Sequence, residues 1–193
     1  MRETPTALKC TTVHEEYGKI AFRQEFRLPN GNVKTFFLFK AKDKPVIIFP
    51  LTVKNEVVAV KHFRYGANDW VMEVPGGVVE GDVTEANIKK NAKRELCEET
   101  GYTSDNIVLV GKETWFDPAS FRVTFYPMLA RECRKVSHQP TPEKTEFLET
   151  CLIPFEQWVE KIKGGEICDS KTIAITMMVL CYLKSNFSFK LSP

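Results

Sequence analysis

RELCEETGY, at residues 94–102, is the segment that indicates a fold and a chemistry most directly. On a helix its three acids, Glu95, Glu98 and Glu99, stand at i, i+3 and i+4 and project from one face. Such a cluster of like charges repels itself. A hard divalent cation such as Mg²⁺ or Mn²⁺ removes the repulsion, because it binds carboxylate oxygens and bridges to phosphate. Arg94, four residues before Glu98, can orient this carboxylate by a charge-assisted hydrogen bond. The spacing therefore predicts a metal-binding helix face.

A solvated, charged helix end is the alternative explanation of these acids. A solvated face normally combines Glu with Lys at i+4, and this segment does not. Glycines also stand on both sides of the segment, at Gly76-Gly77 and at Gly101, and glycine lets backbone approach a ligand closely. These two features favour a binding site over a solvated face.

The residues before the acidic segment predict the helix that carries it. Thr84 can cap the N-terminus of this helix, and Glu85 is favourable in the first turn. Gly101 is placed to end it. One apolar stripe with the spacing i, i+4, i+8 is formed by Ile88, Ala92 and Leu96.

The rest of the chain is mostly β-rich. Predicted strands lie at 19–40 (two runs around a turn at 29–32), 46–53, 56–64, 70–74, 106–116, 122–132 and 147–153, and a polar loop lies at 133–146. Further helices are predicted after Pro154 and after Asp169, the last running to about Leu183. Without a steady β-α-β alternation, this order predicts an α+β fold or a mixed α/β sandwich. A short polar segment ending in Pro45 divides a small β subdomain, 1–45, from a main domain, 46–193.

The composition fits one domain with a small appendage, since the chain has 193 residues. The formal net charge, 27 − 25 = +2, is too balanced to indicate a nucleic acid or a membrane surface as a partner. The longest apolar stretch, 173–183, is far short of the ~20 residues that span a bilayer. The six cysteines include no C-x-x-C spacing, which favours reduced thiols of a cytosolic protein.

Residues 94–102 resemble the second half of the Nudix hydrolase box, G-x5-E-x7-R-E-U-x-E-E-x-G-U, in which U is a bulky apolar residue. The resemblance implies the α/β/α sandwich of that family with a mixed sheet, and a strand-loop-helix catalytic motif. It also implies Mg²⁺-dependent hydrolysis, with Mn²⁺ as a possible substitute, of a nucleoside diphosphate linked to another group.

The first half of the box departs from the family pattern. The box glutamate should fall at residue 86, which is Ala86, and the box glycine at residue 80, which is Glu80. Gly77 stands three residues too early, so the segment looks like one with a three-residue insertion. Either Glu85 or Asp82 could fill the missing acidic position.

The wider context is similar to the ADP-ribose pyrophosphatases of this family. VVAVKHFRYGANDWVMEVPGG, at residues 57–77, resembles the segment that precedes the box in that group, and residues 164–180 resemble its C-terminal helix entry. Pro118 follows the box end by 118 − 102 = 16 residues, an offset typical of that group. The resemblance implies cleavage of ADP-ribose or a related nucleoside diphosphate sugar into a nucleoside monophosphate and a sugar phosphate.

Other substrates and one other class of function stay open. GDP-sugars, FAD and dinucleoside polyphosphates are alternatives within the family. Residue 121 is Phe121, whereas a tyrosine just beyond the proline would favour the dinucleotides. A nucleotide-sensing module without turnover is the alternative of a different class, and the intact acids Glu95, Glu98 and Glu99 count against it.

The resemblance also implies roles for individual residues. The metal ligands would be Glu95, Glu98, Glu99 and the backbone carbonyl of Gly76. The catalytic residues would be Glu146 as the general base, with Glu143 as its alternative, together with Glu98 and Arg94. The candidate substrate-binding residues are Arg64, Glu73, Phe63, Trp70 and Pro118.

Two of these roles have plain structural alternatives. Arg64 would contact the diphosphate, but a salt bridge to Glu73 would explain it equally well. Phe63 and Trp70 could stack on a base, or simply pack in the sheet. In the ADP-ribose group the N-terminal strands pack across a two-fold axis and shape the partner's base pocket, which implies a homodimer.

Overall fold

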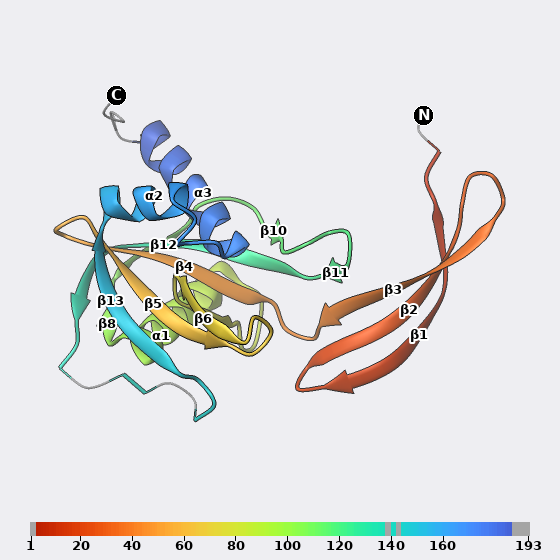
Figure 1. Cartoon of the computed structure of the whole chain (residues 1–193), viewed down its shortest axis with the longest axis horizontal. Coiled ribbons are helices and arrows are strands. Elements are labelled where there is room, and N and C mark those ends of the chain that lie inside the picture. The colour runs from red at the N-terminus through yellow and green to blue at the C-terminus, as the bar shows by residue number, and fades with distance from the viewer. Residues whose placement is uncertain (1–2, 138–139, 142–143, 187–193) are drawn as a thin grey trace. The chain divides into compact units, whose positions relative to one another are not determined.

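The computed structural model describes residues 3–137, 140–141 and 144–186 (Figure 1). The chain divides into two compact units. The N-terminal unit comprises the residues up to Lys44 together with Trp115–Thr124. The main unit comprises Pro45–Thr114 together with the residues from Phe125 onward.

The N-terminal unit is a small sheet built around Phe22. The strands β1 (Thr6–Glu16), β2 (Lys19–Arg27) and β3 (Val33–Ala41) are antiparallel neighbours, and the short β11 (Phe121–Arg122) pairs with β3 in parallel. The Phe22 ring is fully buried, with the Lys40 ammonium 5.4 Å and the Arg122 guanidinium 5.0 Å from its centroid. Cationic side chains therefore cover the small core of this sheet.

The sequence prediction missed β1 because all of its residues are exposed in this chain, so no apolar alternation marks it. Its backbone pairs along the whole of β2, and the Gln24 amide donates to the carbonyls of Leu8 and Lys9 where the register shifts. Pairing with a neighbour, rather than its own side chains, defines this strand.

The main unit is a mixed sheet whose central strand is β4. The parallel neighbour of β4 is β12, and its antiparallel neighbours are β5 and β7. β13 pairs with the edge of β5 opposite β4, β6 pairs with the other edge of β5 beyond the end of β4, and β8 and β9 pair with β12. The bounds are β4 Pro45–Thr52, β5 Glu56–Arg64, β6 Asp69–Glu73, β7 Gly76–Val78, β8 Tyr102–Thr103, β9 Asn106–Leu109, β10 Thr114–Trp115, β12 Thr124–Lys135 and β13 Leu148–Pro154.

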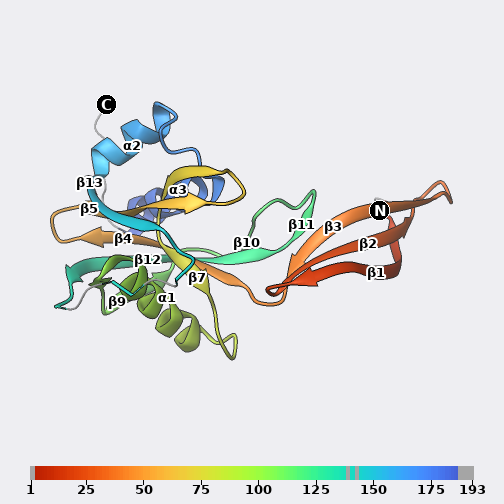
Figure 2. The same ribbon diagram turned by 60° about the horizontal axis from the view of Figure 1, so that its bottom comes forward.

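Helices cover both faces of this sheet, with α1 (Glu85–Thr100) on one side and α2 (Phe155–Lys163) and α3 (Ser170–Asn186) on the other (Figures 1 and 2). On one face Val46 and Ile48 of β4 pack in the core cluster with the apolar stripe of α1. On the other face the Phe49 ring meets Phe155 and Trp158 of α2, each at 6.1 Å between centroids. Successive strand residues point to opposite faces, so β4 is buried on both sides and reads as a continuous apolar run. The α+β sandwich with a mixed sheet is confirmed.

The structure confirms most predicted elements and corrects several bounds. The predicted strand at 106–116 breaks into β9 and β10, and the predicted strand at 122–132 is β11 followed by β12, which runs on to Lys135 into the predicted loop. α3 extends beyond Leu183 to Asn186. Within the described residues no helix is long and apolar enough to cross a membrane.

Candidate active site

α1 begins and ends at the residues that the sequence predicts. The Thr84 side chain accepts a hydrogen bond from the Asn87 N–H, and Gly101 ends the helix in the left-handed conformation, with φ of 71°. Burial of Ile88, Ala92 and Leu96 against the sheet fixes the rotation of the helix. This rotation carries the acidic face toward the loop after β6 and the short strand β7.

The three acids Glu95, Glu98 and Glu99 of α1 differ in burial. Glu99 is 4% exposed as a residue, the Glu95 side chain is 13% exposed, and the Glu98 side chain is 38% exposed. One oxygen of Glu99 accepts a 3.1 Å hydrogen bond from the N–H of Gly76. The helix and β7 are thus joined through a carboxylate and a peptide.

Both positions in β7 require glycine, because neighbouring atoms of α1 and β4 lie too close for a side chain. A Cβ on Gly77 would meet the carboxyl group of Glu95. A Cβ on Gly76 would stand 2.5 Å from the carbonyl oxygen of Val46. Real Cβ atoms do not make such contacts, so the strand can lie between the helix acids and β4 only where side chains are absent.

Arg94 connects the acids to each other. Its guanidinium donates to Glu98 at 2.6 Å, the contact that the i, i+4 spacing predicts, and to Glu95 at 2.7 Å. Burial alone would lower the pKa of Arg94, but the carboxylates of Glu95 and Glu98 outweigh it and raise this pKa. A single cation therefore offsets part of the repulsion between two like charges.

Sequence reasoning left the missing acidic position open between Glu85 and Asp82, and the structure places a third acid, Glu80, beside Arg94. Its carboxylate lies 3.7 Å from Arg94, and its backbone N–H and carbonyl both bond to the Asn91 side chain. Glu85 instead forms an ion pair with Lys89 at 2.6 Å. Spacing could not identify Glu80, because its position depends on the turn at Gly81 and on hydrogen bonds to the side chains of Asn87 and Asn91.

A pocket of about 240 Å³ opens over this face. Its lining residues are Gly77, Val78, Glu80, Arg94, Glu95, Glu98, Glu99, Thr141 and Glu146. The Thr141 N–H donates to the Glu98 backbone carbonyl at 2.9 Å. This bond holds the segment between β12 and β13 against α1. Glu146, the predicted base, shares this pocket with the three helix acids, while Glu143 lies outside the described residues.

The electrostatics of the pocket favour a cation. Burial, followed by the charges of Glu146 and Glu95, raises the pKa of Glu99 well above its ordinary value, although the Gly76 N–H opposes this shift. Burial also raises the pKa of Glu95. Five carboxylates and one arginine are among the lining residues, and these carboxylates form an all-oxygen donor set that suits Mg²⁺ or Mn²⁺.

The donor set therefore fits a hard divalent ion, although its acids are not gathered at one point. No three acidic, cysteine or histidine side chains surround a common centre among the described residues. The carboxylates of Glu95 and Glu98 turn to Arg94, and Glu99 turns to Gly76.

The predicted substrate-binding residues of β5 and β6 lie together. Arg64 Nε donates to Glu73 at 2.5 Å, so the salt bridge offered as the alternative is formed. Glu73 itself is only 1% exposed. The rings of Phe63 and Trp70 pack edge to face with centroids 6.0 Å apart, and Trp70 remains partly exposed.

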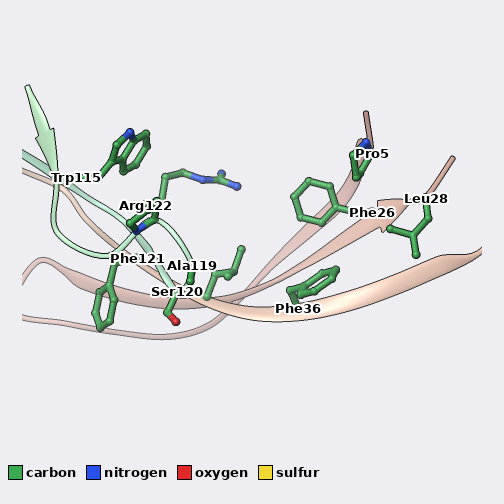
Figure 3. Close-up of a pocket in the computed structure, with 11 residues that line it drawn as sticks. Pro5, Phe26, Leu28, Phe36, Trp115, Ala119, Ser120, Phe121 and Arg122 are labelled. Atoms are coloured by element: carbon green, nitrogen blue, oxygen red, sulfur yellow. The ribbon is translucent and has the colours of Figure 1, made fainter. Parts of the chain in front are cut away.

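Pro118 lies in the N-terminal unit, where it lines a separate pocket of about 390 Å³. Figure 3 shows Trp115, Phe121 and Arg122 from the 115–124 segment, with Phe26 and Phe36 from β2 and β3. The pocket is mainly aromatic and aliphatic, with Arg122 as its charged group.

Comparison with known proteins agrees with the geometry of the main unit. The family model of the NUDIX domain matches residues 41–174. An ADP-ribose pyrophosphatase of Bacillus subtilis (strain 168) is 26% identical over 150 residues, covering 77% of this chain and 78% of the relative. A GDP-mannose pyrophosphatase of Escherichia coli O139:H28 is 27% identical over 165 residues, covering 81% and 75%.

The crystal structure of an ADP compounds hydrolase superposes with a TM-score of 0.82 at 16% identity, covering 97% of this chain and 98% of that one. At this identity the likeness shows the fold alone. The chain belongs to the Nudix family, and the protein is therefore a hydrolase that acts on pyrophosphate bonds.

Replacing Gly77 by alanine should separate the acids from β7 without unfolding the protein. The new methyl group meets only the flexible end of Glu95, so the melting temperature should change little, while displacement of this carboxylate should lower kcat about 10²-fold. Gly164→Ala is the control, since its Cβ makes an ordinary 3.4 Å contact at the end of α2. Equal rates for wild type and Gly77→Ala would contradict the close packing of Gly77 on Glu95.

Proposed function

We propose that this protein hydrolyses the diphosphate of ADP-ribose, or of a related nucleoside diphosphate sugar, with the help of Mg²⁺. The products are a nucleoside monophosphate and a sugar phosphate. The observation that carries the proposal is the pocket over α1, in which Glu95, Glu98, Glu99 and Glu146 gather around little positive charge. The relative from Bacillus subtilis that is called an ADP-ribose pyrophosphatase supports the choice of substrate.

In the proposed mechanism Glu95, Glu98, Glu99 and the backbone carbonyl of Gly76 would hold the ion. It would supply positive charge to neutralise the diphosphate and stabilise the leaving phosphate. Arg94 keeps Glu98 oriented at 2.6 Å. The Gly76 N–H orients the Glu99 carboxylate in the same way, by a hydrogen bond.

Arg64 and Glu146 act on the substrate, Glu146 from the lining of this pocket and Arg64 from the end of β5. The Arg64 side chain is 42% exposed and binds a phosphate oxygen with the part of its guanidinium that Glu73 does not occupy. Glu146 takes the proton of the attacking water. Its place just before β13 leaves this carboxylate on a loop, where a base can adjust to the substrate.

A GDP-sugar is the second candidate substrate, because the match to the GDP-mannose pyrophosphatase covers 81% of this chain. A cytoplasmic location is part of the proposal. It rests on the six cysteines, none of which forms a disulfide bond in the described structure, a pattern that fits a reducing compartment.

An exposed aromatic face on the N-terminal unit supports a homodimer. One face of its sheet carries Phe37, Phe39 and Phe121, all exposed, with the Phe39 ring 5.2 Å from each of the other two. Exposed apolar patches of this kind commonly mark interfaces. We propose a second copy of this chain as the occupant.

The substrate proposal is tested by measuring nucleoside monophosphate release from ADP-ribose, ADP-glucose, GDP-mannose and FAD with Mg²⁺. Wild type should release AMP from ADP-ribose, and Glu99→Gln should lose about 10²–10³ in turnover, taking the loss of one charge-stabilising group as the scale. The variant should keep or raise the melting temperature measured without added metal, since it removes a buried like charge. Faster GMP release from GDP-mannose would select the second candidate. No release from any substrate would favour a nucleotide sensor.

The role of Glu146 is tested by kcat against Mg²⁺ concentration for Glu146→Gln and Glu143→Gln. A base acts mainly in the transition state, so Glu146→Gln should lower kcat strongly, leave KM nearly unchanged and shift the acid limb of the pH–rate profile. Glu149→Gln, an exposed position on β13, is the matched control. Full rescue by Mg²⁺ would make Glu146 a ligand, and a loss confined to Glu143→Gln would move the base there.

The homodimer is tested by light scattering during size-exclusion chromatography. Wild type should elute at twice the 22.1 kDa chain mass, and Phe37→Glu should elute as a monomer because a charge would be buried without a partner. Val53→Glu, at an exposed turn of the main unit, should stay dimeric. A monomeric wild type would contradict the proposal.

A further inference from the structure

A buried group of charges joins the ends of β5 and β6 to the start of α3. Its centre is the carboxylate of Glu73, of which almost nothing is exposed. One oxygen of Glu73 accepts the 2.5 Å hydrogen bond from Arg64 Nε, and the other lies 3.8 Å from Lys171 Nζ. Lys171 in turn donates to Asp169. Each oxygen of the buried acid therefore has a cation beside it.

The fold brings these residues together from three elements. Glu73 lies opposite Val60 in the β5–β6 ladder, so it shares a sheet face with His62 and Arg64, two and four residues farther along β5. The N–H of Val74, next to Glu73, donates to the Thr172 hydroxyl at 3.2 Å. The start of α3 is thus docked against the end of β6.

The charges in this group balance. Burial, together with the positive charges of Arg64 and Lys171, lowers the pKa of His62 to about 4, so His62 is neutral at pH 7. Burial alone would raise the pKa of Asp169, but the Lys171 ammonium outweighs it and lowers this pKa. Burial raises the pKa of Glu73, and the charges of Arg64 and Lys171 oppose this shift. Two cations thus face two carboxylates, and each acid has a charged partner.

Arg64 is the member of the group whose charge acts on the acidic pocket: burial raises the pKa of Glu99, and Arg64 is one of the groups that oppose this shift. The Phe63 N–H donates to the Phe147 carbonyl at 3.0 Å, and the Tyr65 hydroxyl donates to the Thr145 carbonyl at 3.0 Å. These two bonds hold the segment around Glu146 against the end of β5. Arg64 is thus bound to the buried carboxylate at the end of the strand against which the Glu146 segment is held.

We propose that Glu73 is a positioning residue for the diphosphate, supported by Lys171 and Asp169. By binding the Nε edge of Arg64, it leaves the two terminal nitrogens of the guanidinium directed at the substrate. An arginine held by one edge has already lost much of its rotamer freedom, so less ordering is needed when phosphate binds. This inference rests on the proposed function, because it assumes that Arg64 contacts a diphosphate. The sequence predicted that Glu73 touches the substrate, whereas here it acts on the substrate through Arg64.

If the Glu73–Arg64 salt bridge had a structural role only, it would stabilise the fold and would not affect how Arg64 binds phosphate. A double-mutant cycle separates these two roles, because groups that act through one another do not give additive losses. The probe is α,β-methylene ADP-ribose, in which a methylene group replaces the bridging oxygen of the diphosphate and prevents cleavage. Its Kd is measured by calorimetry in the presence of Mg²⁺. Inorganic pyrophosphate is titrated in parallel.

Glu73→Gln should weaken binding of the analogue about tenfold, the scale for a lost hydrogen bond to a charged group. In an Arg64→Ala background the same change should cause no further loss. Lys171→Met should have a smaller effect in the same direction, and it serves as the milder variant if Glu73→Gln fails to fold. Lys161→Met is the matched control, since Lys161 pairs with Glu166 outside this group and should not change Kd.

A spectroscopic readout follows Arg64 without any substrate. The Nε–H resonance of Arg64 should be protected from solvent exchange in wild type and in Lys161→Met, and should broaden or exchange in Glu73→Gln. Additive losses in the cycle, or an unchanged Arg64 resonance in Glu73→Gln, would overturn the positioning role while leaving hydrolysis by wild type intact. A wild type that binds neither the analogue nor pyrophosphate would overturn the proposed function and this inference together.

Discussion

The contact between the Gly76 peptide and the Glu99 carboxylate is the constraint around which the main unit is built. A backbone N–H reaches a buried acid at 3.1 Å, so no side chain can stand between helix and strand at this point. The absence of side chains on Gly76 and Gly77 lets β7 pair with β4 on one side and touch the acids of α1 on the other. A one-residue shift in either element would put a side chain where the carboxylates lie.

The same contact has an energetic cost that the rest of the fold offsets. Burial and neighbouring carboxylates raise the pKa of Glu99, so its ionised form is less stable here than in water. Apolar packing on both sides of β4 supplies the opposing stabilisation: Leu96 is fully buried on the α1 side and Trp158 on the α2 side. Groups of like charge persist where the surrounding structure over-determines their position, and such places are commonly functional.

Charge is organised differently on the two flanks of the acidic pocket. On the helix flank, Arg94 is shared between Glu95 and Glu98. On the β5 flank, the positive charges of Arg64 and Lys171 surround the buried carboxylate of Glu73. An excess of negative charge in the pocket therefore lies within electrostatic range of an arginine that a buried carboxylate holds by one edge.

The sequence by itself determined the elements that depend on local chemistry. The cap at Thr84, the apolar stripe of α1, the left-handed Gly101 and the common face of the three acids all follow from residue type and spacing. It could not locate β1, whose exposed residues are held by pairing alone, or the turn that returns Glu80 to Arg94. Only the tertiary structure decided that Glu146 shares a pocket with the helix acids and that Glu73 is buried beneath Arg64. These contacts join residues far apart in the chain, and their geometry depends on strand register and helix rotation, which no local pattern specifies.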